Sequence, residues 1–145
     1  MRIVLQRVSS ASVKVDGAII GQIGQGYVAL LGIGNSDNRE TVDKMVEKIE
    51  KLRLFPDSHG KTNLSISDIN GELLVISQFT LYADCRKGTR PSFTEAAPPS
   101  LAKELYEYFI EKATLYFQRV ACGVFAADMQ VELTNNGPFT VVLEG

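Results

Sequence analysis

The first third of the chain alternates between apolar and polar positions in the manner of β-strands. Residues 2–8 form a mixed apolar strand, and the alternation continues to Asp16-Gly17, a dipeptide typical of tight hairpin turns. A glycine-rich stretch, 21–26, then leads into an apolar run over 27–33. The stretch lacks the Lys-Ser/Thr pair of a phosphate-binding loop and precedes a strand, so its glycines are interpreted as turn positions with unusual backbone angles. The pattern predicts strands joined by tight turns.

Two later segments have the apolar period of amphipathic helices. The first helix follows Asp37, which with Glu40 resembles a capping box at a helix N-terminus. Its predicted buried face comprises Val42, Met45, Val46, Ile49 and Leu52. Pro98-Pro99-Ser100 introduces the second helix. Its predicted buried stripe comprises Leu101, Leu105, Tyr108, Phe109, Ala113 and Tyr116.

A continuous apolar run lies between the two helices. Residues 73–82 are nearly all apolar, which is typical of a central strand covered on both faces. After the second helix, residues 129–133 alternate and 139–143 form a second apolar segment, with a turn-like 135–138 between them, which predicts a C-terminal hairpin. The order of elements predicts one α/β domain over residues 1–145, with a curved, barrel-like mixed β-sheet that carries two main helices.

Composition and charge narrow the class of protein. Of 145 residues, 45% are hydrophobic and 22% are charged, as in an ordinary globular chain. No apolar run approaches the ~20 residues of a membrane-spanning helix, and the N-terminal segment is too charged for a secretory signal. The formal net charge of −2 excludes a global positive field as the means of holding nucleic acid. A cytoplasmic protein without membrane contact is expected.

The chain lacks the side chains of several common catalytic centres. Cys85 and Cys122 are far apart, with no CxxC spacing and no histidine neighbour, which predicts two free thiols and no zinc site. The single histidine, His59, stands in a turn-like segment and is expected to be a solvated loop residue. No Ser-His-Asp or Cys-His centre is therefore expected, and neither a metal nor a cofactor.

Three polar segments stand where packing alone does not require them. Ser77-Gln78-Phe79-Thr80 ends the most buried predicted strand, a common place for ligands in α/β sheets. Asn135-Asn136-Gly137-Pro138 offers backbone carbonyls free of bulky side chains, although it also suits a plain turn. Arg86, Lys87 and Arg90 form the one dense basic cluster, which suits either phosphate contacts or solvated surface.

Four segments occur in an order and at spacings that resemble the D-aminoacyl-tRNA deacylases, the chiral proofreading enzymes. They are Met1 to Val8, Ser77 to Tyr82, Lys87 to Phe93 and Asn135 to Thr140, and the resemblance runs over residues 1 to 143. It implies the deacylase-like fold, a homodimer, and an aminoacyl-tRNA as substrate. The implied reaction is hydrolysis of the ester between a D-amino acid and the 3′ end of tRNA, together with removal of glycine mischarged onto tRNA for alanine.

The resemblance also implies roles for the candidate residues. It makes Ser77, Gln78, Phe79 and Thr80 the catalytic segment, with backbone N–H groups near Phe79 and Thr80 stabilising the carbonyl oxygen. The attacking group would be water, helped by the 2′-hydroxyl of the terminal adenosine, and Thr80 as nucleophile is the alternative. Gly137 and Pro138, joined by a cis bond in that family, would reach into the partner subunit's pocket and collide with L side chains. The implied lining residues are Phe125, Met129 and Asn135, and the implied tRNA contacts are Arg86, Lys87 and Arg90.

Two positions depart from the pattern of that family, which often has glycine where Ala126 stands and aspartate where Asn136 stands. Ala126 would narrow the pocket wall, which bears more on the glycine activity than on the D-amino-acid activity. Two rival hypotheses remain. One is a nucleic-acid-binding module without catalysis that uses the basic cluster. The other is a small-molecule esterase or amidase with Thr80 as nucleophile.

Overall fold

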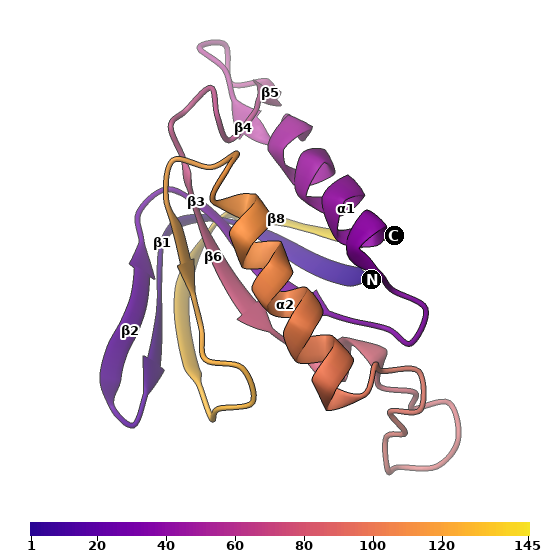
Figure 1. The fold of residues 1–145 in the computed structure, drawn as a ribbon. Helices are drawn as coiled ribbons and strands as arrows, with labels where there is room; N and C mark the ends of the chain where they lie inside the picture. The colour runs from indigo at the N-terminus through magenta and orange to yellow at the C-terminus, as the bar shows by residue number, and fades with distance from the viewer.

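The computed structural model describes residues 1–145 and is organised around one long strand, β1 (Arg2–Val15). Along one edge, β1 pairs antiparallel with β3 (Gly26–Gly32) through its first half and with β2 (Ala18–Ile23) through its second. Along the other edge it pairs with β8 (Gln130–Glu144). The sheet therefore coils around β1 into the barrel-like form predicted from the sequence (Figure 1).

Two further strands make the sheet mixed. β6 (Glu72–Ser77) pairs parallel with β3, and β7 (Val120–Cys122) pairs parallel with β6. A small separate sheet of β4 (Phe55–Pro56) and β5 (Thr62–Leu64) follows the first helix. Six strands thus form the main sheet, with the parallel pairs β3–β6 and β6–β7 beside the antiparallel ones.

Two helices cover one face of this sheet, α1 (Arg39–Lys51) and α2 (Pro99–Ala113) (Figure 1). Their apolar residues and that face form a core of 22 buried residues. The opposite face of β3 and β6 packs against β2 and the second half of β1 in a smaller core. Its members are Val8, Ala11, Val13, Ile23, Val28, Leu74 and Ile76. Because β6 has a core on both sides, residues 73–76 are all buried, as their continuous apolar run predicts.

The predicted strand over residues 73–82 is too long. β6 ends at Ser77, opposite Leu31 of β3, and the next residues form a short 3-10 helix, η1 (Phe79–Tyr82). None of the η1 residues is buried. The apolar run continues beyond the strand because its last residues rest on the end of the sheet, without a core on both sides.

The predicted C-terminal hairpin is wrong. β8 is one continuous strand, and both of its halves pair with β1 in the same antiparallel direction. Between them, residues 136–139 lie opposite the single residue Arg7, because Gln6 pairs with Thr140 and Val8 with Asn135. Glycine and proline mark bulges as well as turns, so the local sequence does not distinguish the two.

The predicted cap of α1 is displaced by one residue. Asn38 is the N-cap, and its side chain accepts a hydrogen bond from the Thr41 N–H at 3.0 Å. Asp37 is buried, only 7% exposed. One of its carboxylate oxygens accepts from the Met1 ammonium, and the other accepts from the Gly34 N–H at 2.7 Å. Asp37 therefore fixes the connection from β3 to α1.

The buried face of α2 differs from the predicted stripe. The buried residues are Ala102, Leu105, Tyr106, Phe109 and Ala113. Tyr108 is half-buried, and Tyr116 lies beyond the end of the helix and is exposed. The Tyr106 hydroxyl donates to the carbonyl oxygens of Val75 (3.1 Å) and Gly123 (3.0 Å), and burial raises its pKa. These hydrogen bonds fix α2 beside β6.

The turn at Asp16-Gly17 has the predicted left-handed backbone, with φ of 50° and 79°. The glycines of 21–26 do not, since none of them has a positive φ. Gly26 is required for another reason, because a Cβ atom there would lie 1.8 Å from the carbonyl oxygen of Glu72. Gly26 therefore permits the close pairing of β3 with β6.

Candidate active site

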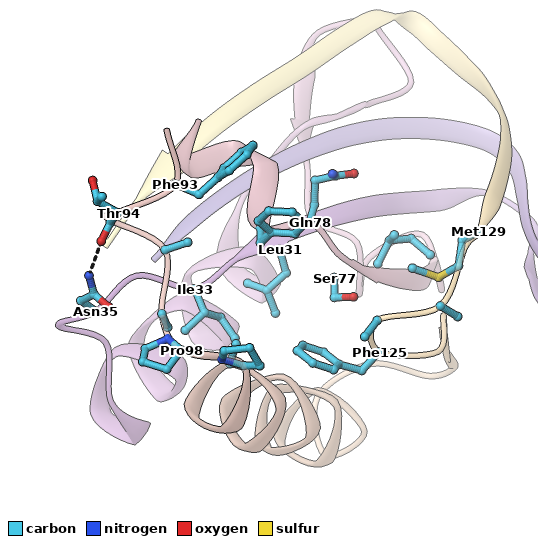
Figure 2. A pocket seen from close by; sticks show the side chains of 18 of the residues that line it. Leu31, Ile33, Asn35, Ser77, Gln78, Phe93, Thr94, Pro98, Phe125 and Met129 are labelled. Atoms are coloured by element: carbon cyan, nitrogen blue, oxygen red, sulfur yellow. Dashed lines mark hydrogen bonds between the residues drawn. The ribbon is translucent and has the colours of Figure 1, made fainter. Parts of the chain in front are cut away.

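A cavity of about 840 Å³ opens where β3 and β6 end and α2 begins. Nineteen residues line it, and Figure 2 shows most of them. The walls come from the two strand ends, the start of η1, the segment 93–99, the first turn of α2, the loop 125–129 and the start of β8. This is the position in which α/β sheets commonly bind ligands. None of the lining residues is Asp, Glu, His, Lys, Arg or Cys, so hydroxyl, amide and apolar groups define the cavity.

Most of the predicted catalytic segment reaches this cavity. Ser77, Gln78 and Phe79 line it, and Thr80 does not. In Figure 2, Ser77 lies above Phe125, with Leu31 on one side and Met129 on the other. The Gln78 N–H donates to the carbonyl oxygen of Leu31 at 2.8 Å, which fastens the chain to β3. The Gln78 side chain donates to the Thr80 hydroxyl, so that hydroxyl already has a partner within the segment.

The start of η1, where Phe79 lines the cavity, has backbone amides without an acceptor inside the helix. The first N–H groups of a helix have no acceptor within it, and the first such bond here runs from Leu81 to Gln78 at 3.2 Å. The amides of Phe79 and Thr80 come before that bond. Phe79 is 57% exposed. Its ring packs edge-on against the Phe93 ring, with the two ring centroids 4.9 Å apart. Such amides can hydrogen-bond an oxyanion without any charged side chain.

The opposite wall is aromatic and apolar. Phe125 and Met129 both line the cavity. The Phe125 ring packs against Tyr106 with centroids 5.9 Å apart, which links this wall to α2. Ala126 also lines the cavity and has a φ of 62°, a left-handed conformation that is uncommon for alanine. This wall suits a planar or apolar part of a ligand.

Asn135, Gly137 and Pro138 do not line the cavity of their own chain. They belong to the bulge of β8, where Gly137 and Pro138 are exposed and joined by a cis peptide bond. The side chain of Asn135 bridges the bulge. Its Oδ1 accepts from the Phe139 N–H at 2.8 Å, and its Nδ2 donates to the carbonyl oxygens of Phe139 (3.0 Å) and Arg7 (3.2 Å). Asn135 therefore braces the bulge instead of lining this cavity.

Arg7, which was not among the predicted site residues, fixes the same bulge from β1. Its Nε donates to the carbonyl oxygen of Asn136 at 2.9 Å, and its Nη1 donates to that of Leu54 at 2.6 Å. Its guanidinium lies 4.5 Å from the centroid of the Phe139 ring. A half-buried arginine within a largely apolar strand is the signal that points to such a role.

The basic cluster lies in a loop beside the cavity. The loop is closed by an antiparallel bridge between Asp84 and Ser92, and all three cations are exposed. Arg86 pairs with Asp84 at 2.8 Å, which raises the pKa of the guanidinium and holds that of the carboxyl well below its usual range. Lys87 and Arg90 have no hydrogen bond or ion pair. Their charges are therefore the ones available to a ligand.

The side chains that bind metals are dispersed over the fold. The structure contains no group of three or more His, Cys, Asp or Glu residues placed to hold a metal ion. Both cysteines are free, and His59 is exposed in a turn. No helix combines the length and the apolar character needed to span a bilayer.

Sequence comparisons link the chain to known proteins. The family model for D-Tyr-tRNA(Tyr) deacylase matches residues 4–144. The D-aminoacyl-tRNA deacylase of Thermosipho africanus is 54% identical over 144 residues, which cover 99% of this chain and 97% of that protein. The D-aminoacyl-tRNA deacylase of Clostridioides difficile is 56% identical over 144 residues, with the same coverage.

Structural comparisons agree with the fold. The c-Myc DNA unwinding element binding protein superposes with a TM-score of 0.95 at 40% identity, covering 100% of this chain and 99% of its own. A probable eukaryotic D-amino acid tRNA deacylase superposes with a TM-score of 0.87 at 15% identity, covering 98% and 97%. The second likeness concerns the fold alone. The mixed sheet with two helices predicted from the sequence is confirmed.

Proposed function

The chain belongs to the D-Tyr-tRNA(Tyr) deacylase family and is a D-aminoacyl-tRNA deacylase, and on that premise we propose how its residues perform and restrict the hydrolysis. The cavity at the end of β6 holds the aminoacyl ester at the 3′ end of the tRNA. The observation that carries this proposal is the start of η1, whose first amides have no acceptor within the helix, at the edge of a cavity that Ser77 and Phe79 line and that contains no ionisable lining side chain. We further propose a cytoplasmic location, where aminoacyl-tRNA is used.

The reaction needs a nucleophile, a means of stabilising the oxyanion, and a leaving group. Water attacks the ester carbonyl carbon, helped by the 2′-hydroxyl of the terminal adenosine, because no lining side chain can act as a general base. The amides of Phe79 and Thr80 donate to the oxygen that becomes negative. The bond from the carbonyl carbon to the 3′-oxygen then breaks, which releases the free amino acid and the tRNA hydroxyl.

The bulge of β8 supplies chiral selection in this proposal. Gly137 and Pro138 are exposed, fixed by Arg7 and Asn135, and absent from the cavity of their own chain. A homodimer in which each bulge enters the partner's cavity accounts for all three features. An L side chain would collide with the backbone carbonyls, while a D side chain points away. Glycine has no side chain to collide, so glycine on tRNA for alanine is removed as well.

The test compares release of amino acid from D-tyrosyl-tRNA and L-tyrosyl-tRNA by the purified protein in the presence of EDTA. The expected result is rapid release from the D form alone. The c-Myc DNA unwinding element binding protein is named for binding DNA, so a nucleic-acid-binding module is the second candidate. Folded protein that binds tRNA and cleaves neither ester would favour that candidate.

Thr80 is expected to be dispensable as a nucleophile. Its hydroxyl lies outside the cavity lining and bonds to Gln78 within its own segment. Thr80→Ala keeps the backbone amide and should retain activity within about tenfold of the wild type, the range of one neutral hydrogen bond. Steady-state hydrolysis of D-tyrosyl-tRNA measures this. Complete loss of turnover in a folded variant would instead support a covalent intermediate on Thr80.

Lys87 and Arg90 are expected to contact tRNA phosphates. Alanine at either position should weaken tRNA binding and reduce the slope of log affinity against log salt by about one for each phosphate that is no longer neutralised. Arg86→Ala is the matched control, because Asp84 already pairs with that guanidinium, and it should change the slope less. Binding titrations at several salt concentrations measure the slopes. Unaltered slopes for Lys87→Ala and Arg90→Ala would place the RNA elsewhere.

A further inference from the structure

The position of η1 depends on few contacts. None of its residues is buried, so no hydrophobic core fixes its orientation. It rests on backbone at the end of β3. A Cβ atom at Gly32 would lie 3.0 Å from the Cβ of Leu81, and one at Gly34 would lie 2.6 Å from the Tyr82 hydroxyl. Gly32 and Gly34 permit this close approach. The Gln78–Leu31 hydrogen bond and the Phe79–Phe93 ring contact hold the start of η1, so its last turn needs contacts of its own.

Arg2 supplies those contacts from the start of β1. Its Nη1 donates to the carbonyl oxygen of Leu81 at 3.1 Å. This oxygen lies near the end of η1 and accepts no hydrogen bond within that helix. Its guanidinium lies 4.7 Å from the centroid of the Tyr82 ring. Its Nε lies 3.3 Å from the carboxylate of Glu144, at the end of β8. One planar group thus joins the last turn of η1 to two strands of the sheet.

We propose that Arg2 is a positioning residue for the hydrolysis. It does not line the cavity, so it acts through η1. By holding Leu81 and Tyr82, it fixes the direction in which the amides of Phe79 and Thr80 point at the other end of the same short helix. This inference rests on the proposed role of those amides. A displacement of about 1 Å in a reacting arrangement can cost on the order of 100-fold in rate.

The test uses Arg2→Ala and Arg2→Lys, with Arg39→Ala as a matched control. Arg39 also pairs with a carboxylate, that of Glu104 at 3.1 Å, and also lies 4.7 Å from a tyrosine ring, that of Tyr108. It stands on α1, away from the cavity lining. The measurements are kcat and KM on D-tyrosyl-tRNA, tRNA affinity, and the melting temperature of each full-length variant.

Arg2→Ala is expected to lower kcat by roughly tenfold or more, within the cost of misplaced catalytic groups, while KM and tRNA affinity stay at the wild-type level. Arg2→Lys keeps the positive charge but not the planar guanidinium, and its kcat should lie between that of the wild type and that of Arg2→Ala. Arg39→Ala should keep the wild-type kcat. If Arg2→Ala does not fold, Arg2→Lys decides, and a wild-type kcat in that variant overturns the inference.

Two other results would also overturn it. A loss of tRNA affinity at unchanged kcat would make Arg2 a direct RNA contact. An equal fall of kcat in Arg2→Ala and Arg39→Ala, following the melting temperature, would make its role purely structural. Failure of the proposed function is distinguishable, because it would show in the wild-type protein as the absence of D-selective release.

Discussion

Replacing Arg7 by alanine is expected to lower the ratio of D-tyrosyl-tRNA to L-tyrosyl-tRNA hydrolysis by roughly tenfold to 100-fold, the equivalent of one charge-assisted hydrogen bond of about 1.5–3 kcal/mol. The guanidinium bonds to the Asn136 carbonyl oxygen and packs on the Phe139 ring, on either side of the residues proposed to reject L-amino acids. Without it the bulge keeps only the Asn135 side-chain bond to the main chain of β1, and its carbonyls can move away from an L side chain.

The measurement is the rate of release from each tRNA under single-turnover conditions. Arg53→Ala is the matched control, because Arg53 also bonds to backbone and side-chain oxygens, those of Asn63, but lies beside the small β4–β5 sheet. The control should keep the wild-type ratio. Continued full rejection of L-tyrosyl-tRNA by folded Arg7→Ala would show that the bulge does not select chirality, or that Asn135 alone suffices to hold it.

Replacing Asp37 by alanine is expected to lower the free energy of unfolding by about 3–5 kcal/mol, the usual cost of removing one partner from a buried ion pair. The carboxylate is almost fully buried and accepts from the Met1 ammonium and the Gly34 N–H. Its removal leaves the Gly34 N–H without an acceptor and the buried Met1 ammonium with only the carbonyl oxygen of Gly145, at 3.1 Å. Gly34 also pairs with Ala96, a cavity-lining residue, so the cavity wall should loosen as well.

Asn38→Ala is the comparison variant, which separates the stability cost of losing the buried ion pair from that of losing the helix N-cap. Asn38 is the N-cap of α1, and its replacement should cost about 1 kcal/mol. Urea unfolding of both variants measures the two costs. A larger loss of stability for Asn38→Ala than for Asp37→Ala would mean that the buried pair contributes little and that the cap dominates.

The sequence predicted the strand core and the buried face of α1 from local apolar patterning, and predicted the buried face of α2 only in part. The apolar run 73–76 and the repeating positions of α1 depend on which faces are covered, and the structure covers those faces. Where the outcome depended on long-range pairing, the prediction failed. The hairpin at residues 135–138 required the two flanking segments to pair with each other. Both pair with β1 instead, a choice made by distant residues.

The candidate site was predicted in part for a similar reason. The segment at Ser77 was singled out because it ends a strongly patterned strand, whereas Phe125 and Met129 were named only through the family resemblance, and the structure places all three at the cavity. Arg2 and Arg7 were missed as functional candidates. The roles proposed for them depend on carbonyl oxygens far away in the chain, at Leu81 and Asn136, which no local pattern reveals.

The proposed chemistry uses atoms that every amino acid possesses. The amides at Phe79 and Thr80 and the carbonyls of the β8 bulge belong to the main chain, so exchanging their side chains does not delete them. Alanine scanning of this protein should therefore give its strongest signals at residues that never touch the substrate, such as Arg2 and Arg7. Substitutions during evolution can therefore change the side chains around the substrate without loss of proofreading, as long as the backbone keeps the same conformation.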